Sequence, residues 1–259
     1  MTYNLILDAQ FLIFLSITRL FLQNNPTNLA TFLYIDTAGE KAIVAISKDN
    51  VLLAIESNET TNSHASFVQV AIDKMLKQLG ISLQAMDAIV VTMGPGSYTG
   101  LRVGLATAKG IAYAINKPLI GISTLVLLAI HAINHIGLVQ TEKDIQIFSM
   151  IDAKRMEVFG AIYKADLSVI LPEQAIVLDQ GFLIKLLENG PTLCVGNGAT
   201  KTSQLYATSQ LYCIEAQYDI KDFMQLALEK WTNKHFENTA YSSPSYLKEF
   251  HQGPTKTTK

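Results

Sequence analysis

A glycine-rich loop is the first candidate for chemistry in this sequence. The stretch Gly94–Gly100 follows a short apolar segment, Ala88–Val91, and precedes residues of helical character. Free backbone N–H groups and the positive end of a helix dipole converge at such a junction, so the loop could bind phosphate. The candidate ligands are Gly94, Gly96, Ser97 and Thr99. The spacing is neither GxGxxG nor GxxxxGK[ST], which excludes dinucleotide and Walker-type motifs and leaves a structural turn capped by Ser97 or Thr99 as the alternative.

Two aspartates stand at matching places in two similar segments. The segments 35–46 and 151–162 both open with Ile-Asp and close with Ala-Ile. This similarity indicates a duplicated α/β unit in which a strand ends in Asp. In an actin-like arrangement Asp36, Thr37 and Asp152 face a cleft between two lobes, where they could hold a magnesium-bound nucleotide. The alternative is that each Asp caps the turn after its strand.

Two histidines have the spacing of a metal pair, but the sequence specifies no third ligand. His131 and His135 are four residues apart, which on a helix places both rings on one face. We interpret them as ordinary helix-end histidines and predict no metal site. Cys194 and Cys213 lack a CxxC pattern and are interpreted as core thiols of a reducing compartment. There is no GxSxG motif, so the sequence contains no autonomous catalytic constellation.

The composition is that of a folded protein without a basic surface. The 259 residues are 49% hydrophobic and 16% charged, and the net charge is −2. This charge argues against an autonomous nucleic-acid binder, which needs a basic excess. The apolar stretch 5–22 lacks a preceding cation and contains Arg19, so we interpret residues 1–30 as an extension and not as a signal peptide. We expect a cytoplasmic protein.

The order of elements predicts two related lobes. In the first lobe, residues 31–120, we expect strands near 32–35, 42–47, 51–55 and 88–91 and helices over 64–79 and 99–115. In the second, residues 121–259, we expect strands over 145–151, 156–163 and 193–195 and helices near 182–188 and 222–231. The uncharged stretch 119–139 is predicted to be a buried strand and a Ser123-capped helix, not a membrane span. The predicted fold class is α/β: an actin-like (ASKHA, ribonuclease H-like) two-lobed fold with duplicated mixed-sheet units.

Two predicted helices carry more apolar or small residues than one core requires. The helix over 64–79 has apolar residues on about half of its circumference, more than the ~100° stripe that a single core needs. The helix over 99–115 has a row of small residues: Gly100, Gly104, Ala108 and Ala112. Each interior glycine costs about 1 kcal/mol relative to alanine. Such a row is typical of a helix that another backbone approaches closely.

Several motifs together resemble one family. The sequence GPGSYTGLRVG over 94–104, the segment DAKRMEVF over 152–159 and the segment VGNGA over 195–199 resemble the TsaB (YeaZ) family over residues 31–259. The resemblance implies an actin-like fold and a noncatalytic paralogue of TsaD, which transfers threonylcarbamoyl to adenosine 37 of ANN-decoding tRNAs. It also implies that Thr124 and Leu128 occupy the positions of the TsaD metal histidines.

The resemblance further implies partners. The chain is expected to dimerise with TsaD, or with itself when TsaD is absent, to recruit the ATPase TsaE, and to meet tRNA only within that complex. The implied partner surface consists of Phe67, Val68, Ala71, Ile72, Met75, Gly100, Arg102, Gly104, Ala108 and Lys109. No cofactor is required by the chain, although ATP or ADP could occupy the cleft or the complex interface. The alternatives are an autonomous actin-like nucleotide-binding enzyme and a zinc peptidase-like protein.

Overall fold

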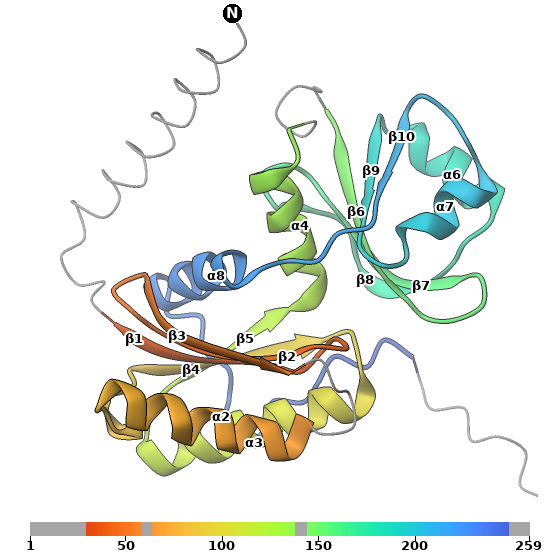
Figure 1. The fold of residues 1–259 in the computed structure, drawn as a ribbon. Coiled ribbons are helices and arrows are strands. Elements are labelled where there is room, and N and C mark those ends of the chain that lie inside the picture. Colours follow the sequence, from red (N-terminus) through yellow and green to blue (C-terminus); the bar gives the residue numbers. More distant parts are fainter. Residues whose placement is uncertain (1–29, 59–63, 138–143, 249–259) are drawn as a thin grey trace, which may run out of the picture.

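The computed structural model describes residues 30–58, 64–137 and 144–248 (Figure 1). Residues 1–29, which form almost all of the predicted N-terminal extension, lie outside this described part. The described chain forms two mixed β-sheets of five strands each, and helices cover both faces of each sheet (Figure 1). This arrangement confirms the predicted two-lobed actin-like α/β fold.

The two sheets share one strand order. The first contains β1 (Thr31–Asp36), β2 (Ala42–Lys48), β3 (Val51–Asn58), β4 (Ala88–Gly94) and β5 (Leu119–Ser123), in the order β3-β2-β1-β4-β5. The second contains β6 (Gln146–Asp152), β7 (Glu157–Tyr163), β8 (Val169–Val177), β9 (Thr192–Val195) and β10 (Leu211–Ile214), in the order β10-β9-β6-β7-β8. In both sheets the opening strand pairs antiparallel with the second strand and parallel with the fourth. The duplication is therefore confirmed, and Asp36 and Asp152 end equivalent strands.

The helices sandwich the sheets. They are α2 (His64–Leu79), α3 (Tyr98–Ile115), α4 (Thr124–His135), α6 (Gln180–Leu187), α7 (Ala199–Leu205) and α8 (Ile220–Thr232), with a short 3-10 helix η2 (Leu83–Ala85). Figure 1 shows α2 and α3 on one face of the first sheet and α8 on the other. The predicted helices are confirmed to within a few residues. The sequence did not predict β8, α7 or β10, because β8 has mostly exposed residues and contains Pro172, and the other two are short.

Strand β1 is buried on both faces. Leu33 and Ile35 point into the core beneath α2 and α3, whereas Phe32 and Tyr34 point into the core beneath α8. Side chains alternate along a strand, so a continuous apolar run supplies both layers. This explains why the segment reads as uniformly apolar.

Helix α4 is shared by both lobes, which explains the long uncharged stretch. Leu127 and Ile130 join the core on the first sheet, and Leu125 and Leu128 join the core on the second. Ser123 caps the helix as predicted, with its hydroxyl oxygen accepting hydrogen bonds from the backbone N–H groups of the next turn. The first sheet extends through residue 123, so a boundary at residue 120 falls inside β5. Among the described residues, no helix has the length and apolar character needed to cross a membrane.

The small-residue row of α3 faces this chain's own first strand. A Cβ added to Gly100 would lie 2.0 Å from the Thr37 carbonyl oxygen, and one added to Gly104 would lie 2.2 Å from the Thr37 hydroxyl oxygen. The close approach predicted from the row is thus confirmed, but the approaching backbone is the end of β1. Gly110, on another side of α3, is exposed and has no atom within 4 Å of an added Cβ.

We predict opposite effects of one substitution at two glycines of α3. Gly104→Ala should lower the free energy of unfolding by about 1–3 kcal/mol, because the methyl group collides with Thr37. Gly110→Ala should raise it by about 0.5–1 kcal/mol, because the site is open and alanine favours the helix. Urea unfolding of both variants checks this. Equal shifts of the same sign would contradict the packing described for α3.

Candidate functional site

The glycine-rich loop is held against the chain that follows β1. The backbone N–H of Ser97 donates to the Ala38 carbonyl oxygen at 2.7 Å, and the Thr37 hydroxyl donates to the Gly100 carbonyl oxygen at 2.7 Å. A Cβ on Gly96 would lie 2.3 Å from the Ala38 carbonyl oxygen. Ser97 is the N-cap of α3 and accepts a hydrogen bond from the Gly100 N–H, so of the two caps named in the alternative interpretation, Ser97 or Thr99, the structure has Ser97. Phosphate binding by this loop stays a prediction; the glycines already have a packing role.

Asp36 is enclosed at the end of β1. The residue is only 4% exposed. Its carboxyl accepts hydrogen bonds from the Ala38 N–H, the Thr92 hydroxyl and the Tyr218 hydroxyl at 3.0, 2.9 and 2.8 Å. Burial raises the pKa of the Asp36 carboxyl, although these three hydrogen bonds oppose the shift. Burial and the adjacent Asp36 raise the pKa of Tyr218 well above its usual range. Both carboxyl oxygens therefore already have protein donors.

Asp152 has a different environment from its counterpart. Its carboxylate is partly exposed, pairs with the Lys201 ammonium and accepts a hydrogen bond from the Lys154 N–H at 2.7 Å. Burial acts against ionisation, but the Lys201 hydrogen bond and charge together with the Lys154 N–H hold the pKa of Asp152 below its usual range. A magnesium ion at Asp36 would have to displace its hydrogen-bond donors, and one at Asp152 would lie near the Lys201 ammonium. The nucleotide site stays a prediction. The sequence pattern carried no signal for Tyr218 or Lys201, because both come from distant segments.

Most residues predicted for the partner surface belong to the chain's own core. Seven of the ten are buried: Val68, Ala71, Ile72, Met75, Gly100, Gly104 and Ala108. In α2 the apolar face rests on the first sheet, and in α3 the row of small residues rests on β1. These side chains therefore support the two helices from beneath. A partner that docks on α2 and α3 would meet their opposite sides.

The two basic residues of the predicted partner surface have contacts within the chain. The Arg102 guanidinium donates to the Tyr98 hydroxyl at 2.9 Å and lies over that ring. The Lys109 ammonium donates to the carbonyl oxygens of Ala240 and Ser242 at 3.1 and 2.9 Å. Lys109 thus fastens a C-terminal segment to α3.

A groove between α2 and α3 is the surface feature that the sequence did not locate. Its volume is about 600 Å³, and it is lined by Gln69, Ile72, Asp73 and Leu76 of α2, Leu83 of η2, and Ala106, Thr107, Gly110 and Ile111 of α3. The lining is mainly apolar, and Ala106 and Gly110 are exposed. Of the ten predicted partner residues, Ile72 is the one that also lines this groove.

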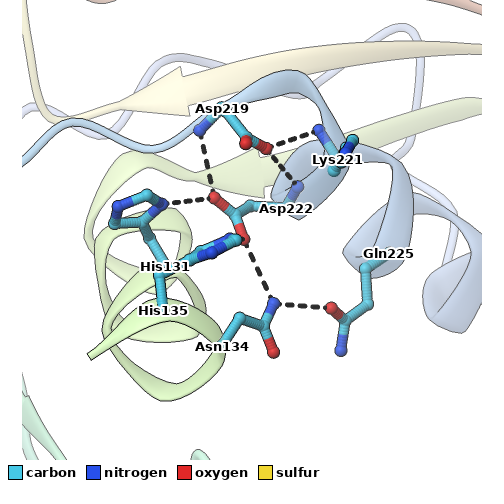
Figure 2. A network of polar contacts seen from close by, with 7 residues as sticks. All are labelled: His131, Asn134, His135, Asp219, Lys221, Asp222 and Gln225. Atoms are coloured by element: carbon cyan, nitrogen blue, oxygen red, sulfur yellow. Dashed lines mark hydrogen bonds and ion pairs between the residues drawn. The ribbon is translucent and has the colours of Figure 1, made fainter. Parts of the chain in front are cut away.

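The histidine pair of α4 lies next to an aspartate, Asp222, that the sequence pattern did not indicate. His131 and His135 lie on one face of α4, as their spacing predicts, and both approach the Asp222 carboxylate of α8 (Figure 2). Ninety-one residues separate His131 from Asp222, so no local pattern could join them.

We predict that Asp36→Asn changes how stability depends on pH. A carboxyl with a raised pKa in the folded state binds more protons in the folded chain than in the unfolded chain. The contribution of Asp36 to the free energy of unfolding therefore falls as the pH rises from about 3.9, the ordinary pKa of aspartate, through the raised pKa of the folded state. The stability of the wild-type chain relative to Asp36→Asn should therefore decrease over this interval. Urea unfolding at several pH values measures the difference.

Asp152→Asn is the matched control with the opposite sign. Its folded pKa is lowered, so the wild-type chain should lose stability relative to this variant as pH falls below about 3.9. A wild-type versus Asp36→Asn difference that stays constant with pH would contradict the environment described for Asp36.

Comparisons with known proteins agree on one group of relatives. The family model described as TsaD, tRNA N6-adenosine threonylcarbamoyltransferase, matches residues 55–183. The chain is 27% identical over 223 residues to the tRNA threonylcarbamoyladenosine biosynthesis protein TsaB of Escherichia coli, covering 83% of this chain and 94% of that protein. It is 26% identical over 178 residues to TsaB of Bacillus subtilis, covering 68% and 74%.

A solved structure has the same fold. YeaZ from Pseudomonas aeruginosa superposes with a TM-score of 0.69 at 21% identity, covering 85% of this chain and all of that one. The motifs, the duplicated strand order and these relatives agree that the chain is similar to the TsaB (YeaZ) proteins.

Proposed function

We propose that the chain is a noncatalytic subunit of tRNA threonylcarbamoyladenosine biosynthesis. In this proposal it dimerises with TsaD, acts together with TsaE, and thereby supports threonylcarbamoyl transfer to adenosine 37 of tRNAs that read ANN codons. It contacts tRNA only as part of that complex. The observation that carries the proposal is similarity to TsaB proteins over most of the chain, since those relatives are named for this biosynthesis.

The site supports a scaffold more than an enzyme. Thr124 and Leu128, at the positions that the family resemblance assigns to the TsaD metal histidines, are buried and offer no imidazole. Asp36 is enclosed by hydrogen bonds within the chain, and Asp152 is paired with Lys201. These environments are consistent with a role in which Asp36 and Asp152 do not act on a substrate. ATP or ADP at the cleft or at the complex interface is not required by the proposal.

The groove between α2 and α3 is the surface that we assign to TsaD. It is apolar, lies on the outer side of the first lobe, and exposes Ala106 and Gly110 along α3. An exposed glycine inside a helix costs about 1 kcal/mol relative to alanine, and no atom lies within 4 Å of an added Cβ at Gly110. A residue without a side chain at this position lets a partner helix approach the α3 backbone closely. In the absence of TsaD, a second copy of the chain would cover the same groove.

We predict that Gly110→Glu weakens the complex with TsaD without unfolding the chain. The substitution places a charge and a long side chain in the groove, and it should reduce affinity by more than tenfold, or about 1.4 kcal/mol. Stability should not fall, because Gly110 is open and glutamate is a better helix former than glycine. Light scattering with size-exclusion chromatography and calorimetric titration measure assembly and affinity with the TsaD of the same organism.

Ile184→Glu provides the matched control. Ile184 lies on α6 of the second lobe and is 48% exposed, so this variant also adds a glutamate to an exposed helix surface but leaves the groove intact. It should bind TsaD as the wild-type chain does. If Gly110→Glu also bound normally, the groove would not be the interface. If the wild-type chain formed no complex with TsaD, with or without TsaE and nucleotide, the proposed function itself would be wrong.

A further inference from the structure

A group of three metal-ligating side chains joins α4 to α8. His131 and His135 project from the last two turns of α4, and Asp222 projects from the first turn of α8 (Figure 2). His131 Nδ1 is 2.7 Å from Asp222 Oδ2, and His135 Nε2 is 3.5 Å from Asp222 Oδ1. One ligand atom from each of the three residues can be chosen so that all lie within 4.8 Å of one another. The two histidine rings are adjacent, with centroids 4.6 Å apart.

The Asp222 carboxylate is buried, and no lysine or arginine of the described residues pairs with it. Its side chain has 0% exposure, and a buried carboxylate is costly unless a cation or several donors compensate its charge. Within the described ranges, the ion pairs of Asp222 are with His131 and His135. A metal ion held by the two imidazoles would bring a positive charge to this carboxylate.

Other polar groups fix the orientation of the carboxylate. The Asn134 side-chain amide donates to Asp222 Oδ1 at 3.1 Å and to the Gln225 side-chain oxygen at 2.8 Å. The Asp219 backbone N–H donates to Asp222 Oδ2 at 3.0 Å as part of the capping box that starts α8 (Figure 2). Hydrogen bonds of this kind hold ligand side chains in place around metal ions.

We infer that His131, His135 and Asp222 form a site for a divalent transition metal ion, with zinc as the ion that suits two imidazoles and one carboxylate. Zinc bonds of about 2.0–2.2 Å to these atoms in a tetrahedron place the ligand atoms ~3.3 Å apart, so side chains whose ligand atoms now lie within 4.8 Å of one another would have to adjust on binding. The metal takes the place of the proton between His131 and Asp222. The His135 side chain is 45% exposed, so water can occupy the fourth position.

The bound ion would have a structural effect. Helix α8 packs on the first sheet, and α4 contributes to the cores of both sheets. A metal shared by α4 and α8 therefore fastens the C-terminal helix to the helix between the two lobes. This inference is independent of the proposed function, because it concerns neither TsaD nor the groove.

The test is zinc binding by the full chain after removal of metal with a chelator. The wild-type chain, titrated with zinc chloride and desalted, should retain one zinc per chain by mass spectrometry of the metal, and its melting temperature should rise. Cobalt(II) should give the visible absorption of a tetrahedral complex. His135→Ala and Asp222→Asn should each lower zinc affinity by at least about 10–100-fold, because each removes or weakens a ligand.

His235→Ala is the matched control, since it removes an exposed histidine outside the cluster and should retain zinc as the wild-type chain does. His135 is partly exposed, so its variant should fold, and circular dichroism checks this. Absence of stoichiometric zinc in the wild-type chain would overturn the inference. Zinc binding that is equally strong in folded His135→Ala would overturn it as well.

Discussion

The contact between the end of β1 and the start of α3 leaves no space for side chains on the facing side of the helix. Thr37 touches Gly100 and Gly104, and Ala38 occupies the position that a side chain on Gly96 would need. Hydrogen bonds from Thr37 and Ser97 close the same junction. Because Asp36 directly precedes Thr37, this packing also fixes the position of the buried carboxyl. The glycine-rich loop is thus explained first by how closely a helix must approach a strand.

The C-terminal part of the chain completes the first lobe. Tyr218 donates to Asp36, the apolar face of α8 covers Phe32 and Tyr34, and Lys109 holds the carbonyl oxygens of residues 240 and 242. The two sheets repeat one topology, but the chain does not divide into two sequential halves. Helix α4 lies where the cores meet, and α8 returns from the second lobe to the first. This return brings Asp222 to the histidines of α4.

The sequence was informative where the physical signal was local. Apolar periodicity located α2 and α3 and most strands, Ser123 was predicted as a helix cap, and the paired Ile-Asp segments indicated the duplication. The signal failed for contacts between distant segments, such as Tyr218 with Asp36, Lys201 with Asp152 and Asp222 with the histidines. No periodicity connects such residues, because their proximity depends on the completed fold.

The side that α3 presents to its own sheet also could not be read from the sequence. Gly104 and Gly110 are both interior glycines of one helix, and six residues at about 100° each separate them by about 240° around its axis. Gly104 is buried against Thr37, whereas Gly110 faces an apolar groove with open space above it. Because packing within the chain already requires a glycine at position 104, Gly104 is no evidence for a partner. Gly110 has no such role within the chain, so it is the glycine of α3 that indicates a docking surface.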